Sequence, residues 1–391
     1  MYKEFNTDFI NAFHDLRSEL LQILLETENY KTAVEEYRRS ERTLLSVNQE
    51  KIPVELPSIN QYAAYLPYNN VLYSYILYAL IPSLLTQKVF IRPSHLSSGA
   101  AIKIDSLLRP FFNNIFLKQW SRREFLHEFV NSCNVVAFTG KYSNLPEVAD
   151  TIQKNQMLVY GGDGLVSFIV HDDADIERAV KGAIRDRLYA SGQDCICPDI
   201  FLIHESIAEK FIRLLTTYLQ NLKFGPHIDE EADYSPILKE QVVLDVNDFL
   251  TNRRQRVIFG GDIDFEKRII PPTILLENDL LNYEYFEFYS PVFRVYKYKS
   301  LNDIIQFYSL PFQEDFKMGA SVFGGKDIVK FLKHNKIIAS YNQTFFDVEN
   351  GNKPFGGYGI RASHALFNGS LVARPILVSS EIKRYLNSFE R

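Results

Sequence analysis

Apolar residues recur at helical spacing near the start of the chain. Phe9, Phe13 and Leu16 fall on one face of a helix, and mostly polar residues separate them. A charged stretch at residues 35–39 follows. We therefore expect amphipathic helices between about residues 8 and 48, each packing one face on a larger body.

From residue 71 onward the pattern changes, because helical segments alternate with short runs rich in β-branched and aromatic residues. This alternation is typical of a parallel sheet with crossover helices. The runs that we interpret as strands lie at residues 89–91, 135–138, 158–160 and 168–170.

A second α/β unit is predicted beyond these strands. Residues 173–189 have a helical pattern with acidic residues first and Arg185 and Arg187 late, an order that suits the helix dipole. Residues 200–203 are expected to form a buried strand, and Ser206 to cap the helix after it. Further strands are expected at residues 257–259, at residues 292–296 and near Val322.

The length of 391 residues favours two domains. We expect a doubly wound α/β domain at residues 1–172 and an α/β domain at residues 173–365. The tail, residues 366–391, is expected to return to the first domain or to a partner subunit.

Composition narrows the function classes. The chain is 46% hydrophobic and 23% charged, as globular proteins are. A net charge of -5 gives no general attraction to nucleic acid or to anionic lipid, so we expect neither as a partner. The longest apolar run, residues 71–85, is too short and too interrupted to span a membrane.

Cysteine usage indicates a reducing compartment. Cys133, Cys195 and Cys197 are too few for a disulfide framework. The N-terminus lacks the apolar core of a signal peptide, and we therefore expect a cytoplasmic protein. No second Cys or His pair stands at a metal-site spacing, so no metal is expected.

The strongest local signal for chemistry is the turn Gly192-Gln193-Asp194-Cys195, between a predicted helix and a predicted strand. A cysteine nucleophile needs room for approach, a lowered pKa and donors for the oxyanion that it creates. Taken alone, Cys195 and Cys197 could equally be small buried hydrophobes.

Several short motifs share the order and spacing of one family with this cysteine turn. Together they resemble the aldehyde dehydrogenase superfamily over about residues 57–376. The motifs are Pro67-Tyr68-Asn69, Arg92 in Val89-Phe90-Ile91-Arg92-Pro93-Ser94, Phe138-Thr139-Gly140, Pro271-Pro272-Thr273, Glu287-Phe288-Tyr289-Ser290-Pro291-Val292, Asn342 and Pro354-Phe355-Gly356-Gly357.

The resemblance implies a fold with a Rossmann-like cofactor domain and an α/β catalytic domain. It also implies that Cys195 is the nucleophile, that Asn69 and the Cys195 backbone N–H form an oxyanion hole, and that Phe355 contacts the substrate. The implied cofactor is NAD or NADP. The implied cofactor-binding residues are Tyr68, Arg92, Ser94, His95, Thr139, Gly140, Gly162, Glu287 and Tyr289.

The cofactor preference is open at this point. Members that prefer NAD often carry an acid where this chain has His95, and a histidine does not repel a 2′-phosphate, so NADP is allowed. Arg92, His95 and Lys141 could equally be surface charges. We expect an aldehyde or acyl thioester as substrate and a homo-oligomer, dimer or tetramer, as the assembly.

One departure from the family pattern narrows the expected reaction. Hydrolytic members have a Glu-Leu-Gly-Gly-Lys motif whose Glu activates water, but the stretch here is Val159-Tyr160-Gly161-Gly162-Asp163-Gly164. The chain is therefore nearest in pattern to the CoA-acylating branch, and we expect the acyl group to leave to a thiol such as CoA.

Two alternatives stay open. In the first, Asp163 or another carboxylate serves as the base, and the protein is a hydrolytic aldehyde dehydrogenase that produces a carboxylic acid. In the second, the chain is a weak or inactive member that acts as a binding protein, because it is short for the superfamily and has Lys141 where a Ser is usual.

Overall fold

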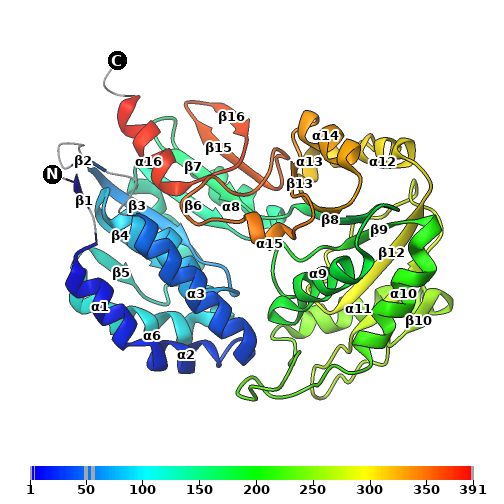
Figure 1. The fold of residues 1–391 in the computed structure, drawn as a ribbon. Helices are drawn as coiled ribbons and strands as arrows, with labels where there is room; N and C mark the ends of the chain where they lie inside the picture. Colours follow the sequence, from blue (N-terminus) through cyan, green and yellow to red (C-terminus); the bar gives the residue numbers. More distant parts are fainter. Residues whose placement is uncertain (1, 4, 48–51, 54–57, 389–391) are drawn as a thin grey trace. The chain divides into compact units, whose positions relative to one another are not determined.

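The computed structural model describes residues 2–3, 5–47, 52–53 and 58–388, which form two compact α/β units (Figure 1). The first unit comprises residues 1–163, 350–356 and 363–391, and the second comprises residues 164–349 and 357–362. The α/β class predicted from the alternation of strands and helices is confirmed, with one largely parallel sheet in each unit.

The first unit contains a seven-stranded sheet. Five neighbouring strands of this sheet, from β7 to the edge strand β5, are parallel. At the other edge, β15 pairs antiparallel with both β7 and β16. In sheet order the strands are β16 (Ser370–Ala373), β15 (Ser363–Phe367), β7 (Met157–Gly161), β6 (Val135–Thr139), β3 (Ile59–Tyr65), β4 (Thr86–Arg92) and β5 (Ile115–Leu117). A separate antiparallel pair joins β1 (Tyr2–Lys3) and β2 (Ile52–Pro53).

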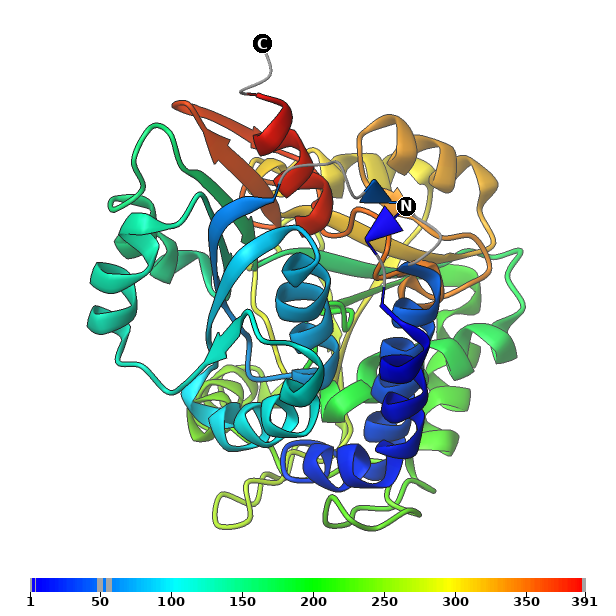
Figure 2. The same ribbon diagram turned by 90° about the vertical axis from the view of Figure 1, so that its left-hand side faces the viewer.

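Helices cover both faces of this sheet because successive strand residues point to opposite sides. Tyr62 and Ala64 of β3 join the apolar cluster under the amino-terminal helices, whereas Ala63 and Tyr65 join the cluster under α7 and α8. Figure 2 shows α7 and α8 on the opposite side of the sheet from the blue amino-terminal helices. The first face carries α1 (Thr7–Asp15), α2 (Arg17–Leu24), α3 (Tyr30–Val47), α4 (Val71–Tyr75), a π-helical segment (Ile76–Leu80), α5 (Ile81–Ser83), α6 (Ser98–Leu108) and α16 (Val378–Asn387), and the second α7 (Arg122–Glu128) and α8 (Leu145–Ala149).

The second unit is built on another seven-stranded sheet, parallel except for one edge strand, β10. In order its strands are β10 (Val257–Phe259), β11 (Thr273–Glu277), β12 (Val292–Tyr298), β9 (Ile200–His204), β8 (Leu165–Val170), β13 (Lys317–Phe323) and β14 (Ile338–Ala339). Its helices are α9 (Ile176–Leu188), α10 (Glu205–Leu219), α11 (Glu240–Thr251), α12 (Leu301–Tyr308), α13 (Gln313–Phe316), α14 (Lys326–His334) and α15 (Phe345–Val348).

Two details differ from what the sequence led us to expect. Strand β8, which we had assigned to the domain at residues 1–172, pairs with β9 and β13 and so belongs to the second sheet. Ser206 lies inside α10, and the ring nitrogen of His204 accepts the Ser206 backbone N–H in its place. Within the described residues, no helix combines the length and the apolar character that a bilayer crossing needs.

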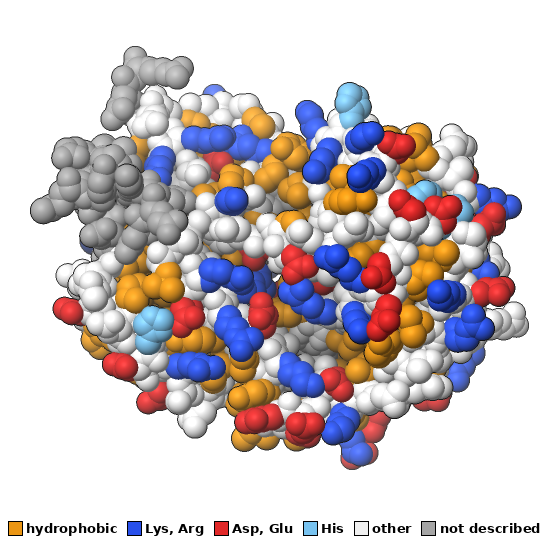
Figure 3. Space-filling view, viewed as in Figure 1, with side chains coloured by type: hydrophobic (Ala, Val, Ile, Leu, Met, Phe, Trp, Pro, Cys, Tyr) orange, Lys and Arg blue, Asp and Glu red, His pale blue; other side chains and the backbone are white. Residues whose placement is uncertain are grey.

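Charged side chains of both signs are interspersed on the face of the molecule drawn in Figure 3. The mixture agrees with the small net charge of -5.

Candidate active site

Most of the expected cofactor residues lie where parallel strands of the first sheet end. The chain runs from β3 outward to β4 and β5, then returns to the other side of β3 as β6 and β7, so its direction reverses between β3 and β6. Open α/β sheets bind ligands outside the carboxyl ends of strands at such a reversal. The residues at this edge are Tyr68 and Asn69 after β3, Arg92, Ser94 and His95 at or after β4, Thr139 and Gly140 at the end of β6, and Gly162 after β7.

Side-chain hydroxyl groups tie together the ends of β3, β6 and β7. The Thr139 hydroxyl donates to the Tyr65 carbonyl oxygen (2.7 Å), and the Tyr160 hydroxyl donates to the Gly140 carbonyl oxygen (3.0 Å). A Cβ at Gly162 would overlap both the Tyr160 hydroxyl and that Gly140 oxygen, so no other residue fits there.

Gly140 leaves room on its other side. Its φ is +146°, and a Cβ built on it would touch only the Phe138 ring, 3.6 Å away. A dinucleotide phosphate needs close backbone approach of this kind, and the edge of the sheet between β3 and β6 therefore fits a dinucleotide.

Arg92 is partly committed to the protein itself. Its Nε–H donates to the Trp120 carbonyl oxygen (3.2 Å), and its guanidinium lies 5.8 Å from the centre of the Tyr65 ring. Burial lowers the pKa of Arg92. His95, by contrast, is exposed at the start of a short helical turn.

Asn69 sits in the turn that joins β3 to α4. The Ser97 hydroxyl donates to the Pro67 carbonyl oxygen (3.3 Å) and ties this turn to the start of α6. Asn70 follows in the left-handed region (φ 49°) and gives α4 no side-chain cap. Phe355, also in the first unit, is anchored by backbone hydrogen bonds in both directions with Ile376 (2.8 and 2.7 Å).

Cys195 follows a strained turn in the second unit. Ala190, Ser191 and Gly192 have consecutive φ values of 48°, 56° and 83°, a backbone that is costly for the two residues other than glycine. Two backbone N–H groups hold the turn: that of Ser235 donates to the Ser191 hydroxyl oxygen (2.8 Å), and that of Leu238 to Gln193 Oε1 (2.9 Å).

The two cysteines of this turn differ in environment. Cys195 is partly exposed, whereas Cys197 is buried and lies 3.7 Å from the Tyr189 carbonyl oxygen. Burial raises the pKa of Cys197 well above its ordinary value.

A buried ion pair that we did not predict braces the cysteine turn. Arg187, at the end of α9, donates to Asp199 Oδ1 (3.0 Å) and through Nε to the Ser290 carbonyl oxygen (2.8 Å). A Cβ at Gly192 would come within 2.5 Å of that same Ser290 carbonyl group. The sequence pattern had indicated only that Arg187 lies late in the helix, where a positive charge suits the helix dipole.

The same brace extends to the segment that carries Glu287. The Phe288 N–H donates to Asp199 Oδ1 (3.0 Å). The Asp199 carboxylate therefore binds both Arg187 and the segment at residues 287–289. The Tyr289 hydroxyl donates to Glu287 Oε1 (3.0 Å), and Tyr289 itself has φ 44°. The second unit therefore holds Cys195, Glu287 and Tyr289 on two segments fixed to one buried ion pair.

The stretch in which we looked for a water-activating base contains one carboxylate, Asp163. Val159 is buried within β7 as part of the apolar core. Asp163 is also buried, and its Oδ2 accepts the Tyr142 N–H (3.1 Å).

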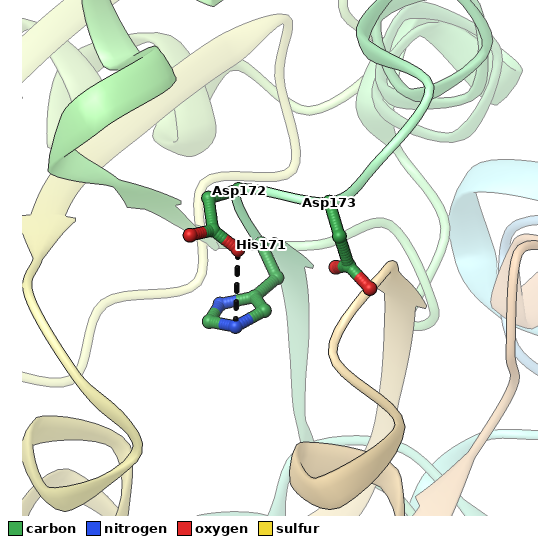
Figure 4. A group of neighbouring side chains, drawn as sticks. All are labelled: His171, Asp172 and Asp173. Atoms are coloured by element: carbon green, nitrogen blue, oxygen red, sulfur yellow. Dashed lines mark ion pairs between the residues drawn. The ribbon is translucent and has the colours of Figure 1, made fainter.

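A second cluster of ionisable side chains lies at the carboxyl end of β8 and lines a cavity of about 580 Å³. Figure 4 shows His171 paired with Asp172, and a carboxylate oxygen of Asp173 lies within 4.8 Å of the ligand atoms of both. His171 Nδ1 lies 2.9 Å from the Tyr298 hydroxyl, and Asp173 Oδ1 accepts the Gly325 N–H (2.7 Å). Protein groups thus account for these contacts, and we assign the cluster no ligand.

A model of the aldehyde dehydrogenase family matches residues 28–362. The 4,4'-diaponeurosporen-aldehyde dehydrogenase of Staphylococcus aureus is 26% identical over 69% of this chain and 59% of its own length. An aldehyde dehydrogenase of Paenarthrobacter nicotinovorans is 32% identical over 46% of this chain and 40% of its own length. A succinate semialdehyde dehydrogenase of Acinetobacter baylyi is 29% identical over 41% of this chain and 34% of its own length. The chain thus spans 34–59% of the length of these curated relatives.

Solved structures have a similar fold. A glyceraldehyde-3-phosphate dehydrogenase of Methanocaldococcus jannaschii, solved with NADP, has a TM-score of 0.81 at 19% identity over 97% of this chain and 86% of its own. A succinic semialdehyde dehydrogenase of Streptococcus pyogenes, also solved with NADP, has a TM-score of 0.79 at 18% identity over 94% and 89%. At these identities the likeness establishes the fold.

Proposed function

Because the chain belongs to the aldehyde dehydrogenase family, we propose that it is an NAD(P)-dependent oxidoreductase that converts an aldehyde into an acyl thioester through Cys195. The strained backbone at residues 190–192, braced by a buried ion pair directly before Cys195, carries this proposal. Such strain persists only where the surrounding structure holds it, and it clusters at functional sites.

The first step forms a bond between sulfur and carbon. The Cys195 thiolate adds to the aldehyde carbonyl carbon, and the carbonyl oxygen becomes an oxyanion. We propose that the Cys195 backbone N–H and the Asn69 side-chain amide donate to that oxyanion, so that Asn69→Ala lowers kcat by about 10²-fold or more.

The residues at the edge of the first sheet fit NAD or NADP, because Gly140 leaves room for close approach at the reversal between β3 and β6. When bound, the cofactor would supply a nicotinamide ring as the acceptor of the hydride that leaves the former aldehyde carbon. Glu287 orients the ribose of that nicotinamide, and Tyr289 holds the Glu287 carboxylate. His95 brings no negative charge toward a 2′-phosphate, so we propose that NADP is accepted.

The acyl group then leaves Cys195 to a thiol. The incoming thiolate attacks the thioester carbonyl carbon, the bond to the Cys195 sulfur breaks, and Cys195 departs as a thiolate. Water would need a general base for the same attack. The apolar Val159 and the engaged Asp163 support release to a thiol such as CoA.

Steady-state NAD(P)H formation from a panel of aldehydes, with and without CoA, tests this proposal. We expect one equivalent of reduced cofactor per Cys195 without a thiol, and continued turnover when CoA is added. Rapid multiple turnover in buffer alone would instead make the protein a hydrolytic aldehyde dehydrogenase. If neither reduced cofactor nor cofactor binding is detected by fluorescence, the chain is a binding protein on this fold.

We also propose that the protein is a homo-oligomer. Strand β16 is the edge of the first sheet, and Leu371 and Val372 on it are each 43% exposed. An edge strand with exposed apolar residues is a template for pairing with another chain. Light scattering should give a multiple of the 45.4 kDa chain mass, and a mass of one chain at micromolar concentration would rule this out.

A further inference from the structure

A buried polar stripe runs along α3, made of Glu36, Arg39, Ser40 and Thr43. Glu36 is 0% exposed, although Glu is among the residues least often buried completely. Burying a carboxyl group costs free energy unless it is hydrogen-bonded, so its partners indicate what it is for.

The partner of Glu36 is the start of α4. Glu36 Oε1 accepts the Tyr73 N–H (2.8 Å), one of the backbone donors that the first turn of a helix leaves without an intrahelical partner. Asn70, the residue in the capping position, supplies no side-chain cap. The cap of α4 therefore comes from another helix, α3.

The rest of the stripe reinforces the same junction. The Arg39 guanidinium lies 4.4 Å from the centre of the Tyr73 ring. A Cβ at Gly351 would come within 2.7 Å of both the Thr43 hydroxyl and the Tyr73 hydroxyl. The polar stripe thus packs against α4 and against the turn at residues 350–352 that leads to Phe355.

A local cap would have been less costly than this arrangement. Burial raises the pKa of Glu36, and the hydrogen bonds from Glu28 and Tyr73 and the charge of Arg39 only oppose that effect. A Ser or Thr with an extended backbone at the capping position would satisfy the helix end without burying a carboxyl group, but Asn70 is in the left-handed region. Only a cap from α3, however, fixes the position of α4 against a second element.

From this geometry we propose that Glu36 is a positioning residue that holds the Asn69 turn at the start of α4. Three residues separate Asn69 from the Tyr73 N–H that Glu36 accepts. The Ser97 hydroxyl fixes the other side of the turn through Pro67. The inference rests on the proposed function, in which the Asn69 amide donates to the oxyanion.

A double-mutant cycle between Glu36→Leu and Asn69→Ala tests the proposal. We expect Glu36→Leu to lower kcat for aldehyde oxidation about 10-fold or more while KM for the aldehyde and the cofactor changes less than about 3-fold, because removing an oxyanion donor outright costs about 10²- to 10³-fold. In the Asn69→Ala background the same substitution should cost less than about 2-fold, since Glu36 acts through Asn69.

Two control variants separate positioning from stability. Glu36→Gln keeps an oxygen that can accept the Tyr73 N–H, so kcat should stay within about 3-fold of the natural protein. Tyr37→Phe removes the hydrogen bond from the neighbouring buried hydroxyl to the Phe13 carbonyl oxygen (3.3 Å) and should leave kcat unchanged. If Glu36→Leu does not fold, the cycle is run with Glu36→Asp, whose carboxyl group is one methylene shorter.

The outcomes distinguish the two proposals. Amide hydrogen exchange should be faster in the first turn of α4 in Glu36→Leu and not in Tyr37→Phe. An unchanged kcat in Glu36→Leu, or the same fold loss with and without Asn69, overturns the role of Glu36. A near-normal kcat in Asn69→Ala alone overturns the oxyanion assignment, and with it the proposed function at that residue.

Discussion

Two thiols on one turn offer the simplest comparison at the scale of single residues. Cys195 is partly exposed, whereas Cys197 is buried and its pKa is raised well above the ordinary value, which keeps that sulfur protonated at neutral pH. We expect Cys195→Ala to abolish NAD(P)H formation and Cys197→Ala to retain most of it. Initial rates with one aldehyde measure both, and an equal loss in the two variants contradicts the assignment.

Asp186 on α9 should make stability depend on pH. Its side chain is 1% exposed beside Ser321, and burial raises its pKa to about 8 from an ordinary 3.8. Between these two values the folded protein holds a proton that the unfolded chain has released. The free energy of unfolding therefore falls as pH rises from about 4 to about 8, by at most about 1.4 kcal/mol per pH unit.

Replacing Asp186 with Asn should remove this dependence. Urea unfolding at pH 5, 6.5 and 8 should show the natural protein losing stability relative to Asp186→Asn as pH rises. The charges of Arg185 and Asp347 act on the pKa of Asp186 in opposite directions, since Arg185 lowers it and Asp347 raises it. Parallel pH curves for the two proteins would show that Asp186 is not the group responsible.

At the scale of elements, α9 carries two arginines near its end with different roles. Arg187 is fully buried with Asp199, whereas Arg185 pairs with Asp347 at the surface. Arg187→Met leaves Asp199 buried without its partner and should lower the free energy of unfolding by about 3–5 kcal/mol. Arg185→Met should cost no more than about 1 kcal/mol.

Chemical denaturation compares the two arginine variants directly. The brace links the Cys195 turn to the Glu287 segment, so Arg187→Met should also lower kcat in the fraction that folds, whereas Arg185→Met should not. Similar stabilities for the two variants would show that the brace is dispensable.

The sequence predicted the helices and strands well where one face of an element is apolar. It did not predict the environment of residues whose burial depends on a partner elsewhere in the chain. Glu36 looked like part of a charged run, although it stands three residues after the buried Ala33, at helical spacing. The burial of Arg187 depends on its ion pair with Asp199, which no local pattern indicates. Strand β8 could not be assigned to a sheet from the sequence, because strands buried on both faces have the same apolar pattern in either sheet.

At the scale of the whole molecule, the motif order led us to propose the cysteine turn and the cofactor residues, but it gave no sign of the bracing network around them. Short motifs identify residues that face a ligand. The ion pair at Arg187 and the cap from Glu36 act between elements far apart in the chain, 12 and 37 residues respectively, and no local pattern encodes such pairs.

The first unit depends on residues 363–391. Residues 363–391 add β15, β16 and α16, and β15 is the neighbour of β7. A chain ending at residue 362 should leave the β7 edge unpaired and should aggregate or unfold. Adding residues 363–391 as a separate peptide should restore soluble protein and NAD(P)H binding, measured by fluorescence. A stable, soluble truncated chain would contradict this.

The first unit is made of three separate segments of the chain, and this has a consequence for biosynthesis. The chain passes between the two units after residues 163, 349, 356 and 362. During translation strands β3 to β7 leave the ribosome before the second unit, but their sheet waits for β15 and β16 until residues 164–349 have been made. The second unit can close earlier, because nearly all of it is contiguous. The unit whose strands emerge first is therefore completed after the other, and its incomplete sheet is exposed to chaperones on the nascent chain.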